Sequence, residues 1–268
     1  MKYMLISVVA MLIAFGAGYL AARLIVKRTS ENHRGIKTAV ITVSAGVLIF
    51  AAAAFVYLSS GYYYADEAAK EALLGNDKVV VSKIDGGYFF DGPSSSKAIV
   101  FYPGAKVECE AYAALMLKLA EKGIDCFLAD MPFNFALFGT DAADKFVNAY
   151  NSYDTWMVGG HSMGGIVAAD YANKNSDIID GVVLLASYTT VEIGDGLELC
   201  SIYGSEDGCL ERDVYSDNRD NWPENSRELI IDGGNHAQFG NYGTQKGDGA
   251  AAISAEEQQK ITVDEIVN

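Results

Sequence analysis

A short glycine-rich motif limits the fold of this chain more than any other stretch. Residues 158–165 read Val-Gly-Gly-His-Ser-Met-Gly-Gly and place Gly160, Ser162 and Gly164 in the spacing Gly-x-Ser-x-Gly. In this spacing a strand ends, the chain turns sharply, and a helix begins directly after the serine. The glycines are needed because a Cβ atom at either position would collide with the neighbouring backbone. The motif therefore predicts a strand, a tight turn that presents Ser162, and a helix, in that order.

The residues on both sides of the motif fit this prediction. Residues 154–158 form a short apolar run of strand-forming residues, and residues 165–172 have the spacing of an amphipathic helix. The free N–H groups at the start of such a helix, and the positive end of its dipole, face any negative charge that forms at Ser162. A chance match is the alternative in a chain with 27 glycines, but the flanking patterns and the additional Gly165 favour the turn.

With these residues the sequence resembles the α/β-hydrolase superfamily, and more narrowly its small, lidless esterase and dienelactone-hydrolase-like branch. The resemblance extends over about residues 78–266. It implies an α/β-hydrolase fold, in which a mostly parallel sheet carries helices on both faces. It also implies a serine nucleophile that works with a histidine and an acidic residue.

The apolar pattern after residue 78 supports the same fold class independently. Strand-like and helix-like segments alternate, which predicts a mostly parallel sheet covered on both faces. Strands are expected at residues 78–84, 87–91, 98–102, 124–129, 154–158, 181–187, 197–203 and 227–231, and helices at 65–74, 108–122, 141–150, 165–172 and 254–267.

The first 60 residues contain two long apolar runs, at 4–22 and 39–59. Each is long enough to cross the roughly 30 Å hydrocarbon core of a membrane as a helix. A cleaved signal peptide is the alternative for the first run, but the sequence lacks a clear small-x-small cleavage site and the second run follows closely. We therefore expect two transmembrane helices with a basic connector over residues 1–60, a juxtamembrane helix within 61–77, and the α/β-hydrolase domain over 78–268.

Charge is distributed unevenly along the chain. The first 60 residues hold six of the 20 Lys and Arg residues and one of the 35 acidic residues, so residues 61–268 carry a net charge of −20. This acidic body argues against nucleic acid as a partner, because phosphate binding needs a basic face. The basic connector predicts a cytoplasmic loop, since Lys and Arg near membrane spans stay on that side. We therefore expect a two-pass protein of the cell membrane, with the lipid bilayer as partner and an extracytoplasmic catalytic domain.

The general base is identified by elimination. A serine hydroxyl is a poor nucleophile at neutral pH and needs a base. Of the three histidines, His33 lies in the basic connector, and the side chain of His161 is expected to point away from the serine. This leaves His236, in the loop after the last expected strand. The motif Gly-Asn-His-Ala-x-Phe-Gly around His236 resembles the one found in the dienelactone-hydrolase-like branch.

The acid is expected between the serine and the histidine in the chain, which is the order found in this superfamily. Asp207 fits because it follows an expected strand in a tight turn, and this turn resembles the family's Gly-x-x-Asp-Gly. Glu206 is the neighbouring competitor, and Glu192 or Asp195 would serve if the acid followed the preceding strand. Asp232 is close in sequence to the histidine but is expected to end a strand.

Acyl transfer also needs donors for the negative oxygen that develops in the transition state. We expect one donor from the backbone N–H of Met163. The second should come from the loop after the strand that contains Tyr102, where Tyr-Pro-Gly-Ala-Lys-Val resembles the family's Tyr-Pro-Gly-Gly-Lys-Val. Either Gly104 or Ala105 can supply this N–H. Tyr102 and Lys106 are candidates for the substrate side, with a solvated surface position as the alternative for Lys106.

Together these features predict a membrane-anchored serine hydrolase that cleaves an ester, thioester or small amide in a small-molecule or envelope-derived acyl substrate. An acyltransferase or peptidase with the same triad, and a non-catalytic receptor on a hydrolase fold, are the alternatives. The sequence contains neither a metal-ligand cluster nor a phosphate-binding loop, so no metal or cofactor is expected. Cys200 and Cys209 flank the acid turn and are either bridged, in an oxidising compartment, or two separate thiols.

Overall fold

The computed structural model describes residues 16–20, 34–58, 60–93 and 96–268. Internal contacts divide the chain into two compact units, Met1–Gly61 and Tyr62–Asn268. Apart from residues 16–20, the expected first span at 4–22 lies outside the described residues, and so does most of the basic connector.

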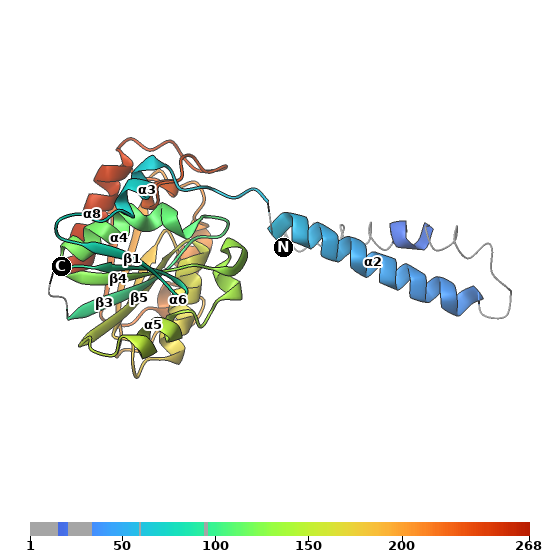
Figure 1. Ribbon diagram of the computed structural model, residues 1–268, viewed down its shortest axis with the longest axis horizontal. Helices are drawn as coiled ribbons and strands as arrows, with labels where there is room; N and C mark the ends of the chain where they lie inside the picture. Colours follow the sequence, from blue (N-terminus) through green and yellow to red (C-terminus); the bar gives the residue numbers. More distant parts are fainter. Residues whose placement is uncertain (1–15, 21–33, 59, 94–95) are drawn as a thin grey trace. The chain divides into compact units, whose positions relative to one another are not determined.

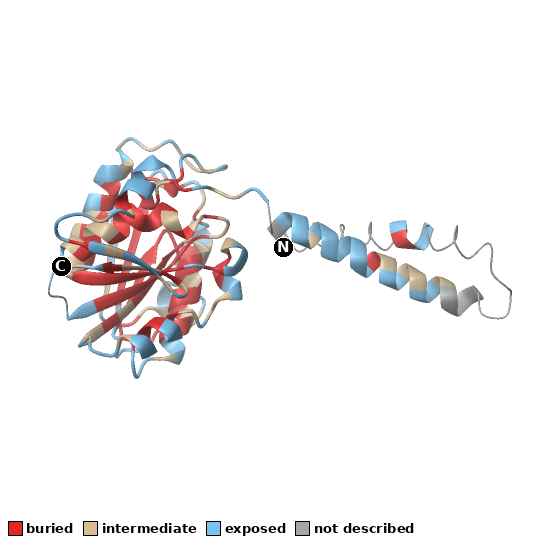
Figure 2. Cartoon of the chain, viewed as in Figure 1, coloured by how far each residue is buried: buried red, intermediate tan, exposed pale blue. Residues whose placement is uncertain are grey.

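Helix α2 (Arg34–Leu58) is the main described element of the first unit. Its segment Thr38–Tyr57 has a mean hydropathy of 2.5 and is long and apolar enough to cross a membrane. Figure 2 shows α2 largely exposed. It is one such helix among the described residues, and a single helix of this kind is weak evidence for a membrane location. The expected second span is therefore present as a helix, whereas the expected pair of spans is not established.

Residues 16–20 are helical, and Gly18 packs closely against α2 within this unit. A Cβ atom at Gly18 would lie 2.8 Å from the carbonyl oxygen of Thr42 and 3.0 Å from the amide nitrogen of Gly46. Both glycines are buried. Residues without bulky side chains allow two helices to approach this closely.

The described residues of the second unit form an eight-stranded sheet with the strand order β1-β2-β4-β3-β5-β6-β7-β8. The strands are β1 (Val80–Ile84), β2 (Gly87–Asp91), β3 (Lys97–Tyr102), β4 (Ile124–Ala129), β5 (Thr155–His161), β6 (Gly181–Leu185), β7 (Glu198–Gly204) and β8 (Ser226–Ile231). β2 pairs antiparallel with β1 and with β4, and the other neighbouring pairs are parallel. The predicted mostly parallel sheet is confirmed.

Helices cover both faces of this sheet (Figure 1). On one face lie α3 (Glu67–Ala72), α4 (Ala113–Glu121) and α8 (Ala255–Val267), and on the other lie α5 (Ala143–Ala149) and α6 (Met163–Lys174). The remaining helical elements are α7 (Arg212–Asp217) and the 3₁₀ turns η2 (Cys109–Tyr112), η3 (Pro132–Asn134), η4 (Ala136–Phe138), η5 (Arg219–Asn221) and η6 (Ala237–Phe239). Successive strand residues point to opposite faces, so Ile99 of β3 packs into the core beneath α4 and Val100 into the core beneath α6.

Two helical elements differ from the sequence prediction. The helix expected over residues 108–122 is divided into the turn η2 and helix α4, and Tyr112 at the junction has φ −96° and ψ 3°. Helix α7 was not expected, because among its six residues only Tyr215 is buried. A helix this short with one core residue leaves no apolar period in the sequence.

The segment after the first unit belongs to the globular body. Asp66 caps α3 by accepting a hydrogen bond from Ala69 N (3.0 Å), and both Ala65 and Ala69 are buried in the core that contains α4. Further out, Tyr63 N donates to the carbonyl oxygen of Lys106 (2.7 Å), and the carbonyl of Tyr63 accepts from Glu108 N (3.0 Å). The juxtamembrane helix was expected within residues 61–77, and from Tyr62 onward this segment is part of the second unit.

All four cysteines are free thiols. Cys200 lies near the amino end of β7, opposite Arg227 of β8. Cys209 lies beyond the carboxyl end of β7, where Gln245 Nε2 donates to its sulfur at 3.4 Å. The strand between them, from Cys200 to Gly204, spans about 13 Å at 3.3 Å per residue, whereas a disulfide requires Cα atoms less than about 7 Å apart. The bridge that the sequence left open is therefore excluded in this fold.

Candidate active site

Ser162 occupies the tip of the turn between β5 and α6, as the motif predicts. Its backbone has φ 53° and ψ −122°, a left-handed conformation that is strained for a residue with a side chain. A Cβ at Gly160 would collide with the backbone of Gly164, and a Cβ at Gly164 with the carbonyl oxygen of Tyr102. Ser162 N donates to Leu185 O of β6 at 2.9 Å, which holds the turn against the sheet.

Asp207 and His236 meet beyond the carboxyl ends of β7 and β8. His236 Nδ1 lies 2.9 Å from Asp207 Oδ2 and 3.1 Å from Oδ1, and both side chains are buried. Asp207 Oδ1 also accepts the backbone N–H groups of Cys209 and Leu210, each at 2.8 Å. These bonds fix the carboxylate and require that His236 carries its proton on Nδ1, so that Nε2 is the free basic nitrogen.

The competing acids do not share this position. Glu206 is exposed and accepts a hydrogen bond from the neighbouring Ser205 hydroxyl at 3.1 Å. Glu192, Asp195 and Asp232 are likewise exposed. Within the described residues, the carboxylate that contacts the His236 ring is that of Asp207.

Ser162 and His236 are not joined by a hydrogen bond within the described part of the chain. His236 Nε2 is buried and has no partner there. The ring of His161, which directly precedes the serine, lies 4.4 Å from the His236 ring, centroid to centroid. This contact brings the serine turn and the histidine loop together. Catalytic hydrogen bonds are often long in sites without substrate and shorten only when substrate binds.

The sequence assigned no role to His161, but the structure places it inside the site. Gly104 N donates to the Tyr112 hydroxyl (3.1 Å), and the oxygen of this hydroxyl is also hydrogen-bonded to His161 Nδ1 at 2.8 Å. Burial, and then the positive charge that His236 acquires, hold the pKa of His161 well below its usual range. His236 therefore packs against a neutral imidazole.

Most backbone amides of the loop 103–107 are already engaged in hydrogen bonds. Gly104 N is committed to Tyr112, Lys106 N donates to Asn134 O (2.7 Å), and Val107 N donates to Gly104 O (3.2 Å). Pro103 has no N–H. Among the described residues no hydrogen bond is donated by the amide of Ala105 or by that of Met163 at the start of α6. Ala105 rather than Gly104 therefore fits the second donor position.

The two expected substrate-side residues differ in their surroundings. Tyr102 is fully buried; its hydroxyl donates to Thr140 O and accepts from Ala143 N, both at 3.1 Å. It faces the core beneath α5 and α6, so a substrate-side role does not fit. Lys106 is partly exposed, with φ 63°, in the same loop as Ala105.

A loop after β4 was missed by sequence reasoning. We call residues 132–138 the aromatic loop. Phe133 is 47% exposed, Leu137 57% and Phe138 53%, and Phe133 and Asn134 both have left-handed φ values, of 56° and 52°. Asn134 O accepts the amide of Lys106, and η4 packs against α6. The aromatic loop thus contacts both the loop 103–107 and helix α6. A run of apolar residues after a strand carries no sequence signal that distinguishes exposure from burial.

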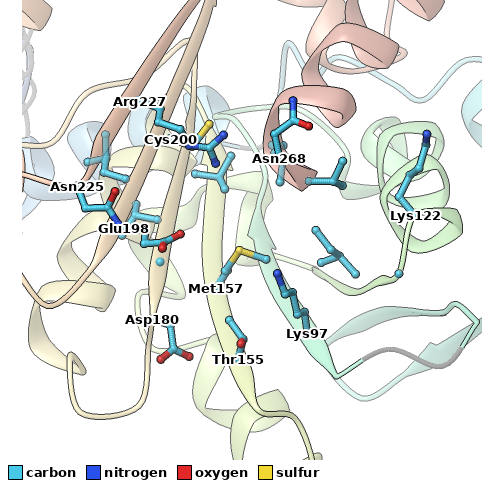
Figure 3. Close-up of a pocket in the computed structure, with 18 of the residues that line it drawn as sticks. Lys97, Lys122, Thr155, Met157, Asp180, Glu198, Cys200, Asn225, Arg227 and Asn268 are labelled. Atoms are coloured by element: carbon cyan, nitrogen blue, oxygen red, sulfur yellow. The ribbon is translucent and has the colours of Figure 1, made fainter.

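A groove of ≈ 740 Å³ lies at the other end of the sheet. It is lined by Lys97, Thr155 and Glu198, the first residues of β3, β5 and β7 (Figure 3). None of the predicted site residues lines it, because they follow the carboxyl ends of the strands. The described residues contain no cluster of His, Cys, Asp and Glu side chains suited to a metal ion.

Comparison with known proteins adds a family and a set of similar folds. Residues 98–260, more than half of the chain, match the model of a family described as the alpha/beta hydrolase family. A search of curated proteins finds no match.

The similar solved structures are remote in sequence. A dienelactone hydrolase from Anabaena variabilis gives a TM-score of 0.53 at 12% identity, covering 70% of this chain and 97% of that chain. Carboxyl esterase 2 from Tuber melanosporum gives 0.52 at 11% identity, covering 78% and 90%. A predicted CIB-like hydrolase from Thermoplasma acidophilum gives 0.50 at 19% identity, covering 71% and 98%. At these identities the likeness shows the fold alone.

The Tyr112 bonds predict a measurable loss of stability in Tyr112→Phe. The substitution leaves the buried N–H of Gly104 and Nδ1 of His161 without partners, at a cost of about 2 kcal/mol. In a domain of this size that lowers the midpoint of thermal unfolding by about 4–8 °C. Intrinsic fluorescence of the full chain in detergent micelles measures it. Tyr64→Phe, at a side chain 63% exposed, is the control and should leave the midpoint unchanged; an equally small change in Tyr112→Phe would contradict the bond network.

Proposed function

Because the chain belongs to the alpha/beta hydrolase family, we propose that it is a serine hydrolase that cleaves an ester, thioester or small amide. The observation that carries this proposal is the buried contact between Asp207 and His236 Nδ1 at 2.9 Å. It lies at the same edge of the sheet as the strained turn that presents Ser162, and this is the arrangement of a nucleophile, a base and an orienting acid.

The chemistry follows from these positions. Ser162 Oγ attacks the carbonyl carbon of the substrate and gives its proton to His236 Nε2, while Asp207 stabilises the resulting imidazolium. The N–H groups of Met163 and Ala105 donate to the oxygen that becomes negative. His236 returns the proton to the leaving alcohol, thiol or amine, and an acyl group remains on Ser162. Water then attacks this acyl-enzyme with His236 as base, and the carboxylic acid and free serine are released.

Removing the nucleophile or the base should abolish most turnover. Ser162→Ala and His236→Ala are each expected to lower kcat for a p-nitrophenyl ester by at least about a thousandfold, and the double variant should be little slower than either, because the groups act as a unit. Ser82→Ala, at an exposed position on β1, is the matched control and should retain full activity. Full activity in Ser162→Ala would exclude the proposed mechanism. Failure of a fluorophosphonate probe to label Ser162 in the wild-type chain would favour a non-catalytic receptor.

The aromatic loop supports a substrate with an apolar group beside the scissile bond. The carbonyl oxygen of Asn134 accepts the amide of Lys106, in the loop that carries Ala105, and the left-handed φ of Phe133 is a kind of strain that clusters at ligand-binding sites. Phe133 and Phe138 lie with their ring centroids 6.0 Å apart. Together they offer an apolar surface to an acyl chain or aryl group.

A chain-length series tests this surface. Burying one CH₂ group contributes up to about 0.8 kcal/mol, and the hexanoate has four more than the acetate. If about half of this gain is realised, kcat/KM should rise about tenfold from p-nitrophenyl acetate to the hexanoate. The double variant Phe133→Ser with Phe138→Ser should lose this rise and keep the acetate rate. Leu74→Ser, which changes an exposed leucine on α3's C-terminal side, is the control and should keep the rise. An unchanged hexanoate preference in the double variant would exclude the assignment.

We also propose that the chain is anchored as a two-pass hairpin with its catalytic domain outside. Helix α2, the close packing of Gly18 on it, and the basic residues between 23 and 37 support this arrangement. An epitope tag at the C-terminus should be reached by antibody on intact cells as well as on permeabilised cells. Staining that appears only after permeabilisation would place the domain in the cytoplasm.

A further inference from the structure

One carboxylate outside the triad contacts both loops that carry the acid and the base. Asp248 lies in the loop between η6 and α8. Its Oδ1 accepts the backbone N–H groups of Gly208 (3.2 Å), His236 (3.2 Å) and Gly249 (2.8 Å), and its Oδ2 accepts that of Ala237 (2.8 Å). Three of these four donors flank or belong to the triad residues. A single side chain therefore joins the acid turn to the histidine loop.

The backbone around Asp248 is fitted closely to the acid turn. A Cβ at Gly208 would lie 2.6 Å from the carbonyl oxygen of Gly247, and a Cβ at Gly249 would overlap that of Glu206. On the other side, Asn235 Nδ2 donates to the carbonyl of Gly249 at 2.9 Å. The segment 247–249 is thus held between the two loops, in contact with both.

Other bonds between these loops lie nearer to the strand ends. Glu206 N donates to Gly234 O, and Gly233 N donates to Ser205 Oγ, each at 2.8 Å. They fix the bases of the loops, whereas the bonds of Asp248 fix the parts that carry the reacting groups.

We propose that Asp248 is a positioning residue that sets the distance and orientation between Asp207 and the His236 ring. It acts through backbone N–H groups on both sides of this pair and does not touch the substrate. The inference rests on the proposed function, because the pair it positions is the acid and base of that reaction.

Kinetics of two Asp248 variants test the proposal in the full chain in lipid nanodiscs. Asp248→Ala removes all four acceptor bonds, and a displacement of about 1 Å in a catalytic pair costs on the order of a hundredfold. We expect kcat for p-nitrophenyl butyrate to fall about a hundredfold, with KM within about twofold of the wild type. Asp248→Asn keeps one oxygen but turns an NH₂ group toward a backbone donor, so kcat should fall about tenfold. Asp232→Asn, at an exposed acid in the segment that precedes His236, is the matched control and should match the wild type.

A spectroscopic readout separates failure of this inference from failure of the proposed function. In ¹⁵N-histidine-labelled protein, the downfield proton on His236 Nδ1 reports the contact with Asp207 whether or not an ester is turned over. It should be sharp in the wild type and in Asp232→Asn and exchange faster with water in both Asp248 variants. A wild-type signal in folded Asp248→Asn, or unchanged kcat in that variant, overturns the positioning role, and this holds even if Asp248→Ala does not fold. A sharp wild-type signal without any turnover or fluorophosphonate labelling instead rejects the proposed function.

Discussion

The direct backbone contact between the start of α6 and the end of β3 is the constraint on which the site depends. A side chain at Gly164 would collide with the carbonyl oxygen of Tyr102, and its absence lets α6 begin directly beside the end of β3 and the loop that follows it. Ser162 and Ala105 are thereby brought to one edge of the sheet. The strained φ of Ser162 persists because its N–H is bound by Leu185 and its carbonyl accepts the Ser187 hydroxyl at 2.6 Å.

The polar groups around the site are held mainly by backbone dipoles. The carboxylate of Asp207 takes two backbone N–H groups in addition to His236, and that of Asp248 takes four. Burial, and then the charge of a protonated His236, hold the pKa of His161 well below its usual range, so this imidazole is neutral. In a globular body with a net charge of about −20, this arrangement places anions in the site without a matching number of Lys or Arg side chains. The donors are fixed by the fold itself, so they need little reorganisation when charge develops.

Much of the fold and of the candidate site was predictable from local steric constraints and from the order of the strands along the chain. The Gly-x-Ser-x-Gly spacing determines its own turn. Both ends of each strand between residues 124 and 231 agree with the prediction to within two residues, except the end of β5, which extends to His161 instead of Val158. What the sequence could not supply depends on contacts between distant segments. Gly104 and Ala105 are distinguished only by the hydroxyl of Tyr112, which reaches the loop from the start of another helix. Tyr102 was expected on the substrate side, but the alternation of side chains along β3 places it in the core beneath α6. Asp248 belongs to no motif, and its role appears only once two loops from different strands lie beside it.

The pairing of Tyr63 with the loop after β3 has a practical consequence for protein production. Residues 62–66 give Lys106 and Glu108 their backbone partners, and Ala65 covers part of the core beneath α4. A soluble fragment cut at residue 78, where the family resemblance begins, would strip these partners from the loop beside Ala105 and expose apolar surface. A fragment that begins at Tyr62, the boundary of the second unit, keeps them. A soluble form of the globular body therefore has to include residues 62–66, although they lie outside the region of family resemblance.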